Sequence, residues 1–384
     1  MTDAFYSDDV LIEAPRHVYR YLIADIRTNE IIAELPSNGC TYSFKLSEAG
    51  AFSATLSMND EVLAQDPQTA TIPGRNAIYV MRDDTVVWGG ILWGRRYSVT
   101  ERKLELDAET FESYLDRIFQ ASTKKWVNTE QLDIARWLLS SRQVQDSLMM
   151  DIGTTVSGRK RDRKMYKFEY KEIGEEMSQL AGLIDGFDYG VEVYHDRKTH
   201  EIRRKFQFYY PSRGRTPNKS SLVFEYPGSI TSIDVDLDAQ EGANIVFTLG
   251  SGTGAEMVVG SAVDSAQIAA GWPPLEISRS FTSVKDLATL NAHAKNVLVL
   301  KKTPIEIFNV NVRADVDPEI GTYTVGDWAK FEFDDPFIGE FSAWRRIVEI
   351  SVSVSDKGVE SISLTLDAGQ EPREEEDDAA ETEE

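Results

Sequence analysis

Residues 75–118 constrain the fold of this chain more than any other stretch, because strand and helix patterns follow each other there without a break. Residues 77–81 and 86–88 are β-rich runs, and the acidic pair between them predicts a turn. Over residues 103–108, charged and apolar side chains alternate as in a strand with one buried face. Apolar residues then recur at helical spacing after Thr110, a suitable N-cap. The stretch predicts β-strands closed by one amphipathic helix, and it contains no catalytic constellation.

The net charge of −23, with 64 acidic against 41 basic residues, argues against a surface built to grip phosphate backbones. Part of the excess lies in residues 368–384, a Pro- and acid-rich segment without apolar periodicity that predicts a solvated, disordered tail. Cys40 is the only cysteine, which excludes an intrachain disulfide and a multi-cysteine zinc site and predicts a buried small side chain.

Membrane and secretion signals are not evident in the sequence. No apolar run approaches the roughly 20 residues that span a bilayer. The acidic first residues lack the basic-then-apolar order of a signal peptide. We therefore expect synthesis in a cytoplasm and no membrane anchor.

The patterns divide the chain into four predicted parts, and the length suits two or three folded domains. Residues 1–119 predict an N-terminal β-barrel tube domain, with Gly89-Gly90 marking a bulge or a close backbone approach. Residues 120–215 predict an α+β insertion. Residues 216–367 predict a C-terminal β-rich region with a second barrel and one helix, and residues 368–384 the acidic tail. The fold class is therefore mainly β with an α+β insertion.

Four local features refine this division. Residues 59–73 predict a loop, and Asn128 with Gln131 fits a capping box at a helix start. Ser283 with Asp286 opens a second long helix. The last strands predict a hairpin that turns at residues 356–358, with one Ser/Thr-rich face suited to water or a polar neighbour.

The order of these elements resembles the hub proteins at the tail tip of long-tailed bacteriophages, often described as minor tail or baseplate hub proteins. The shared features are a Trp-Gly-Gly strand at 86–92, an ESYLDRI helix at 112–118, a Gly-rich segment at 249–257 before a helix at 284–300, a Gly-Asp strand pair at 323–328 and a closing hairpin at 346–366. The resemblance covers most of residues 15–367. The middle region matches only loosely, the acidic tail has no counterpart, and no single motif is specific.

This resemblance implies a structural role in the virion rather than catalysis. It implies two related β-barrel domains per chain and three chains, hence six barrels in a pseudo-hexameric ring through which the genome passes without specific binding. The implied partners are two further copies of the chain, the distal tail protein, the tape-measure protein and a receptor-binding or fibre protein. No cofactor, metal or catalytic residue is implied.

Two other function classes remain open. A distal tail or carbohydrate-binding tail protein would be hexameric or monomeric. A tail-associated peptidoglycan hydrolase would carry a recognisable nucleophile or zinc site, and the sequence offers neither.

Motifs with catalytic associations have simpler explanations in this chain. The GSGTG at 250–254 lacks the helix and the later acidic residue of a dinucleotide fingerprint, so it predicts a hairpin loop. Two of the four histidines, His195 and His200, flank a charged turn, which favours a surface role over a metal site. The chain contains no GxSxG motif, and its paired carboxylates carry little information in so acidic a sequence.

Residues 159–164 and 197–205 make the middle region locally basic. They predict either two solvated loops or a contact with an acidic partner or nucleic acid. If they face acidic parts of neighbouring subunits, charge complementarity would guide the register of assembly.

Overall fold

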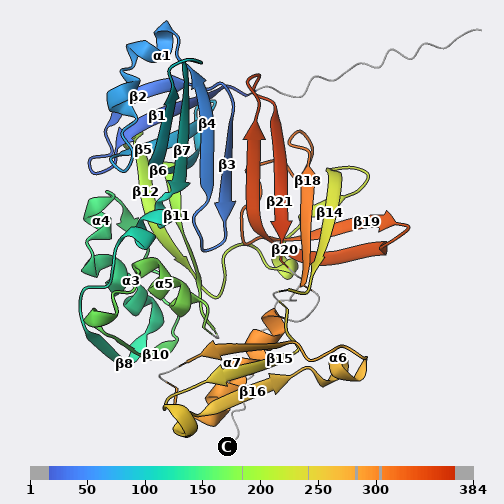
Figure 1. Ribbon diagram of the computed structural model, residues 1–384. Coiled ribbons are helices and arrows are strands. Elements are labelled where there is room, and N and C mark those ends of the chain that lie inside the picture. The colour runs from blue at the N-terminus through green and yellow to red at the C-terminus, as the bar shows by residue number, and fades with distance from the viewer. Residues whose placement is uncertain (1–16, 184, 241, 282–283, 302–304, 368–384) are drawn as a thin grey trace, which may run out of the picture.

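The computed structural model describes residues 17–183, 185–240, 242–281, 284–301 and 305–367. The predicted acidic tail at 368–384 therefore lies outside the described residues. Strands dominate the structure. Several helices lie in the middle of the chain, and one long helix lies near residue 290 (Figure 1). The prediction of a mainly β chain with an α+β segment between two β-rich halves is confirmed. The domain boundaries at 119, 215 and 367 stay a prediction.

The first half forms seven antiparallel strands of one large sheet, in the order β3-β4-β7-β6-β5-β1-β2. These strands are β1 (Tyr19–Asp25), β2 (Ile31–Pro36), β3 (Cys40–Lys45), β4 (Ala51–Ser57), β5 (Asn76–Arg82), β6 (Thr85–Ser98) and β7 (Lys103–Thr110). The alternation of apolar and charged residues predicts which side of β7 faces the core. Leu104, Leu106 and Ala108, the apolar residues of this pattern, are buried as predicted.

This half of the sheet curls back on itself. Tyr21 on β1 and Phe52 on β4 lie four strands apart along the sheet, which would separate them by ~19 Å if it were flat. Their ring centroids are 5.5 Å apart. Among the described strands the pairing path stays open at β2, so this half is a curled sheet rather than a closed ring of strands.

Gly90 allows the close backbone approach that the sequence predicts. A Cβ atom at this position would lie 2.2 Å from the Glu109 carbonyl oxygen on β7 and 2.5 Å from the Trp88 ring. No other residue fits between these two strands without displacing one of them.

Two details of the first half differ from the prediction. Residues 59–73 are not a plain loop but hold α1 (Asp60–Ala64) and α2 (Pro67–Ala70), because Asn59 Oδ1 accepts the Val62 amide as an N-cap. The closing helix is the 3₁₀ helix η1 (Phe111–Arg117). Thr110 does not cap it, since its hydroxyl accepts the Gly50 amide instead.

The middle of the chain is an α+β unit that covers the outer face of β1, β5 and β6 (Figure 1). Its elements are β8 (Lys124–Glu130), α3 (Gln131–Ser141), α4 (Val144–Ser147), β9 (Asp151–Ile152), β10 (Lys160–Met165), η2 (Lys167–Glu169), α5 (Ile173–Ala181), β11 (Asp188–His195) and β12 (Ile202–Tyr209). The predicted hairpin is present as β11 and β12. The predicted capping box is wrong: Glu130 caps α3 by accepting the Asp133 amide, and Asn128 lies in β8 with φ of 48°.

The second half extends the large sheet in the order β14-β18-β21-β20. Its strands are β14 (Ile230–Asp238), β18 (Ile305–Val312), β19 (Trp328–Asp335), β20 (Gly339–Val354) and β21 (Glu360–Leu366), with β13 (Val223–Glu225) paired to β19 after η3 (Pro217–Lys219). The predicted final hairpin is β20 and β21.

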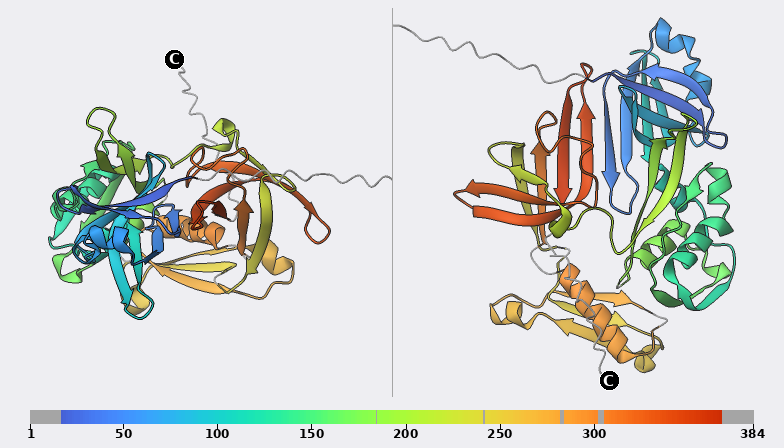
Figure 2. Two further views of the ribbon diagram at one scale, coloured as in Figure 1. Left: turned by 90° about the horizontal axis from the view of Figure 1, so that it is seen from above. Right: turned by 180° about the vertical axis from the view of Figure 1, so that it is seen from behind.

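A smaller unit, residues 245–300, lies below the second half of the large sheet (Figure 2). Its sheet has the order β16-β15-β17, and one long helix covers one face. Its elements are β15 (Ile245–Leu249), η4 (Gly254–Glu256), β16 (Val259–Val263), α6 (Ser265–Ala269), β17 (Glu276–Ser280) and α7 (Leu287–Leu300). Asp286 caps α7 by accepting the Thr289 amide, whereas Ser283 lies outside the described residues.

The two halves join edge to edge through β3 and β20, so that segments about 300 residues apart share one 13-stranded sheet. A single hydrophobic core follows this sheet across the junction, with Tyr42 and Phe52 from the first half and Ile350 and Val352 from the second. None of the described helices has the length and apolar composition needed to cross a bilayer.

Candidate functional site: the polar face of the large sheet

One face of the large sheet is polar over seven neighbouring strands, β14, β18, β21, β20, β3, β4 and β7, that come from both halves of the chain. Alternate residues of these strands are buried in the core, as Tyr42, Val352 and Leu364 are. The residues between them point to the opposite face, because successive side chains of a strand alternate sides. The strand periodicity that forms the core therefore also creates this second surface.

Matched register aligns the polar side chains into rows that cross the sheet. The rows are Ser232–Asn311–Ser363–Ser351–Ser43, Asp234–Asn309–Thr365–Glu349–Lys45 and Ser361–Ser353–Thr41–Ser53–Asp107. All three rows cross the β3–β20 junction without interruption. We call these three rows the polar face.

Hydrogen bonds between neighbouring strands hold the polar face together. The hydroxyl oxygens of Thr41 and Ser353 are 3.1 Å apart across the junction. Thr365 Oγ1 donates to Asn309 Oδ1 at 3.1 Å, and Asn309 Nδ2 donates to Asp236 at 3.3 Å. Such cross-strand polar pairs add small stabilising terms and keep short side chains flat against the sheet.

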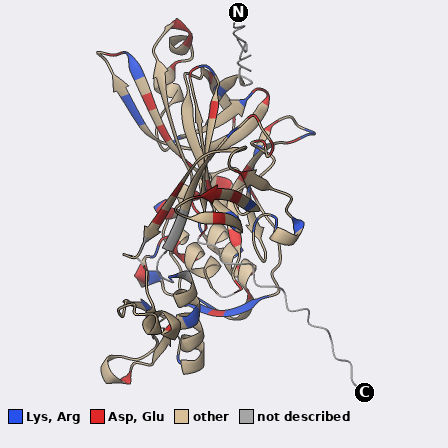
Figure 3. Ribbon diagram, turned by 90° about the vertical axis from the view of Figure 1, so that its right-hand side faces the viewer, with Lys and Arg blue, Asp and Glu red and all other residues tan. Residues whose placement is uncertain are grey.

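The charge of the polar face is negative. Asp107, Asp234 and Glu349 lie within the three rows, and Lys45 is their single cation. Lys45 Nζ lies 3.9 Å from Glu349, so its charge is balanced locally. Figure 3 shows acidic positions recurring along the strands. A surface of hydroxyls and carboxylates attracts water and repels phosphate.

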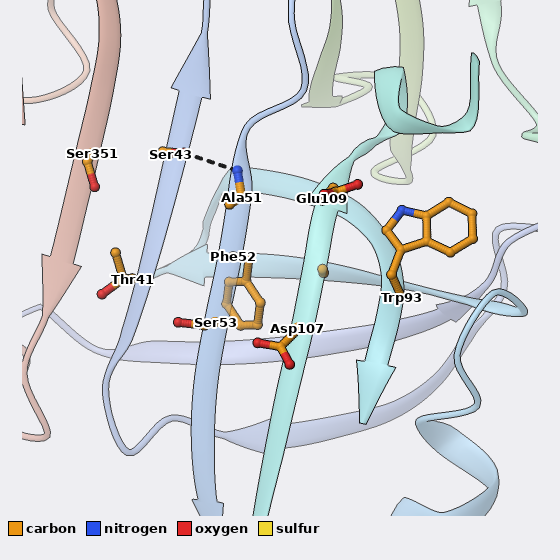
Figure 4. A pocket seen from close by; sticks show the side chains of 10 residues that line it. Thr41, Ser43, Ala51, Phe52, Ser53, Trp93, Asp107, Glu109 and Ser351 are labelled. Atoms are coloured by element: carbon orange, nitrogen blue, oxygen red, sulfur yellow. Dashed lines mark hydrogen bonds between the residues drawn. The ribbon is translucent and has the colours of Figure 1, made fainter. Parts of the chain in front are cut away.

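Two shallow grooves meet on the polar face. One, of about 370 Å³, is lined by Thr41, Ser43, Ser53 and Ser351 together with Asp107 and Trp93 (Figure 4). The second, of about 470 Å³, shares Thr41, Ser53 and Asp107 and continues toward Glu105 and Ser355. They are open troughs with hydroxyl and carboxylate walls, and the residues present offer no nucleophile–base pair.

A separate pocket of about 180 Å³ lies where β11 crosses β6, and it contains the buried carboxyl of Glu112. The Val191 amide donates to Glu112 Oε1 at 2.5 Å. Oε2 is buried without a hydrogen-bond partner among the described residues. Desolvation raises the pKa of Glu112, although the hydrogen bond from the Val191 amide and, to a smaller extent, the charge of Arg213 oppose the shift.

The raised pKa of Glu112 predicts a pH-dependent stability. Because the folded chain holds this proton more tightly than the unfolded chain, the free energy of unfolding falls as pH rises above the ordinary carboxyl value of about 4.3. Glu112→Gln removes the ionisation and keeps an acceptor for Val191. The variant is expected to be more stable than the natural chain at neutral pH, and the difference should close near pH 4. Denaturant unfolding at both pH values measures this, and a variant less stable at neutral pH would contradict it.

The residues that the sequence marked for possible chemistry do not come together. His17 Nδ1 lies 2.8 Å from Asp83, and His293 stacks on Phe281 with 4.4 Å between ring centroids. His195 and His200 flank the β11–β12 turn, as expected. Within the described ranges, no group of three or more His, Cys, Asp or Glu residues is arranged to hold a metal ion.

Two further predictions are confirmed. The GSGTG segment at 250–254 connects the antiparallel strands β15 and β16 as a hairpin loop. Cys40 is a buried free thiol, and burial raises its pKa to about 11.

The two basic segments are largely strands rather than solvated loops, although residues 197–201 form the exposed turn between β11 and β12. Lys160–Met165 is strand β10, in which Arg163 forms an ion pair with the buried Glu176. Arg204 lies in β12 and is only 1% exposed. Charge reversal of Arg159, Arg161 and Arg163 would therefore disturb the fold as well as any contact with a partner. Basic composition predicted exposure, but the strand alternation of these segments turns every second side chain inward.

The sequence missed most of the polar face. It marked the Ser/Thr-rich face of the final hairpin, which supplies Ser351, Ser353 and Ser363. The matching positions in β3, β4 and β7 carry the same alternation of small polar with apolar residues and would have extended that signal. Nothing in the sequence indicated that β3 and β20 pair.

No protein-family model matches the sequence, and no curated protein matches it. Solved structures do. A tail protein from Neisseria meningitidis MC58 superposes with a TM-score of 0.60 at 13% identity, over 90% of this chain and 96% of that chain. The 43 kDa tail protein of prophage MuSo2 from Shewanella oneidensis gives a TM-score of 0.59 at 11% identity, over 91% and 98% of the two chains.

The chain has the fold of phage tail proteins. The resemblance to hub-type tail proteins is therefore confirmed at the level of the fold. The match extends over nearly the full length of both tail proteins, so it includes the α+β unit and the smaller unit as well as the large sheet. A chain of the Francisella PdpA–VgrG complex also matches, with a TM-score of 0.50 at 10% identity, over 94% of this chain but only 60% of that chain.

Proposed function

We propose that this chain is a structural hub protein of a phage tail tip. Three copies form a ring of six β-rich halves that joins the tail tube to the tip, and the polar face lines the channel through which the genome passes. The observation that carries the proposal is the polar face itself, in a chain with the fold of phage tail proteins. The chain acts by assembly, without turnover of a substrate.

The chemistry of the polar face suits a channel wall. Duplex DNA presents phosphates continuously, and each Lys or Arg that neutralises a phosphate adds affinity. The three rows contain hydroxyls, amides and carboxylates with Lys45 as their single cation, and Lys45 faces Glu349. DNA can move past such a wall with little electrostatic attraction to it.

The edge of the large sheet supports assembly into a ring. β14 pairs with β18 on one side and with no described strand on the other. Its Leu237 is 62% exposed. An open strand edge with an exposed leucine invites pairing with another chain, and a closed ring of copies satisfies every such edge in the same way.

The proposed partners follow from this place in the particle. We infer that the ring contacts a distal tail protein above, a tape-measure protein within and a receptor-binding or fibre protein below. The Francisella neighbour lies in a complex with a second protein, and a role within a multi-protein assembly is consistent with that likeness. The proposed location of the chain is the tail tip of the virion.

New cations on the polar face test the proposal. Thr41→Lys, Ser53→Lys and Ser353→Lys place three lysines side by side on adjacent strands, at exposed positions. In a ring these charges surround the channel and bind phosphate, so genome release is expected to slow several-fold. Release is followed by the fluorescence of a DNA-binding dye, while electron cryomicroscopy of the same particles counts three copies per tail.

The matched control replaces the same three residues with Gln, which adds length but no charge, and should release DNA at the natural rate. If the lysine variant also released DNA at the natural rate, the polar face would not line the channel. A copy number other than three would contradict the ring, whatever the release rate.

A further inference from the structure

A second charged surface, of the opposite sign, lies on the ribbon formed by β8 and β10. One face of the ribbon is covered, because Trp126 is buried against Trp137 of α3 with 4.9 Å between ring centroids. On the other face Lys125 and Lys164 are directly opposite each other and exposed. Lys124, the first residue of β8, is exposed at the end of the ribbon although its register partner Met165 is buried. The Lys167 amide donates to Thr123 at 3.0 Å, which brings Lys167 to the same end.

The four lysines, Lys124, Lys125, Lys164 and Lys167, lack ion-pair partners within the part of the chain that the structure describes. Two carboxylates lie close by, and each accepts a backbone amide, Asp162 from Asn128 at 2.6 Å and Glu169 from Tyr166 at 3.4 Å, without forming an ion pair with these lysines. Like charges directly opposite on paired strands destabilise the pair.

Aromatic rings extend the cluster. Lys164 Nζ lies 4.4 Å from the centroid of the Tyr166 ring, and the Tyr166 and Phe168 rings are 5.0 Å apart. Phe168 is 73% exposed. An exposed aromatic pair is typical of a contact surface, and the lysines beside it favour a partner of negative charge. We call these six residues, Lys124, Lys125, Lys164, Tyr166, Lys167 and Phe168, the lysine–aromatic patch.

We propose that the lysine–aromatic patch binds the acidic segment 368–384 of the same chain. That segment contains nine Asp or Glu residues against Arg373, a net charge of −8. Its carboxylates supply the counter-charge that the patch lacks. The contact holds the tail against the α+β unit, away from the polar face.

The segment starts within reach of the patch. The Asp367 amide donates to Arg346 O at 2.8 Å, and the Arg346 side chain pairs with Asp188 at the start of β11. The neighbouring Phe187 amide donates to Ala181 O at the end of α5. A path from Asp367 to the patch follows these contacts to the end of α5. The nine residues of α5 add about 13 Å to this path, and three residues then connect the start of α5 to η2, which contains Lys167 and Phe168 of the patch.

This path is about 40 Å long by standard chain dimensions. The 17 residues of the segment span up to about 56–61 Å when extended. The tail can therefore reach the patch within one chain and still place several carboxylates on it. The inference is independent of the proposed ring.

Zero-length carbodiimide crosslinking of the full-length chain tests the contact, because it joins only lysines and carboxylates in direct contact. Crosslinks between the four patch lysines and residues 371–384 are expected in low salt. They should fall to background at about 1 M salt, where the Debye length is about 3 Å. Mixing isotope-labelled with unlabelled chains identifies which copy supplies each tail, and the crosslinks should join residues of one copy.

Charge reversal provides the control. Lys125→Glu with Lys164→Glu should abolish the crosslinks to the remaining patch lysines. Lys198→Glu with Lys219→Glu, at exposed lysines elsewhere, should leave them unchanged. Crosslinks spread evenly over all surface lysines would overturn the proposal, as would crosslinks only between copies. The proposal would also be overturned if no crosslinks formed and the patch instead bound a DNA oligonucleotide through Lys125 and Lys164.

Discussion

Replacing Arg204 with methionine is expected to lower the free energy of unfolding by about 3–5 kcal/mol. The Arg204 guanidinium is buried and donates to Ile26 O and Leu148 O at 2.8 and 2.7 Å, and to Asn29 Oδ1 at 2.8 Å. It also lies 4.5 Å from the centroid of the Phe111 ring. These partners belong to the first half of the sheet and to the α+β unit, so one side chain ties the two together.

The cost arises from the acceptors that remain. Methionine fills much of the space but donates no hydrogen bond, which leaves two buried carbonyl oxygens without a partner. Arg204→Lys should recover only part of the loss, because an ammonium group cannot reach acceptors arranged around a planar guanidinium. Denaturant unfolding followed by tryptophan fluorescence measures both variants.

The adjacent Arg203 supplies the matched control. It pairs with Glu201 near the surface, and such a pair contributes at most about 1 kcal/mol. Arg203→Met should therefore unfold nearly as the natural chain does. A loss below about 1 kcal/mol in Arg204→Met would mean that Arg204 does not hold the α+β unit in place.

Replacing Glu360 with alanine is expected to destabilise the junction between the two halves by about 2–4 kcal/mol. The Glu360 side chain is 3% exposed. It accepts from Arg82 Nε at 2.6 Å and from Arg82 Nη2 at 3.0 Å, and it also accepts from the Tyr19 hydroxyl. This bidentate pair connects β21 of the second half with β5 and β1 of the first.

Loss of the carboxylate leaves the partly buried Arg82 guanidinium without its acceptor, which is costlier than the loss of an exposed pair. Glu349→Ala is the matched control, because Glu349 also joins the two halves by pairing with Lys45 at 3.9 Å, but on an exposed face. It should cost less than about 1 kcal/mol. A double-mutant cycle of Arg82→Met with Glu360→Ala measures the coupling, and a coupling near zero would contradict the role of the pair.

Local pattern predicted the secondary structure of the sheet well, and it failed where polar side chains had competing partners. The strict alternation of β7 and of the final hairpin gave both the strand and the buried side, because a strand needs only a period of two. The caps at Thr110 and Asn128 were wrong because each residue is used elsewhere, Thr110 by Gly50 and Asn128 within β8. Short-range spacing cannot report such competition.

Patterns in the sequence are enough to indicate a mainly β chain with an α+β middle, a buried Cys40, a close strand approach at Gly90 and an excess of acidic residues. These properties depend on periodicity, composition and backbone sterics, which are local. The pairing of β3 with β20, the burial of Arg204 and the alignment of polar rows from both halves into one face became visible only in the folded chain. Each of these results from residues far apart in sequence meeting in register, and the pattern of one strand does not specify its partner.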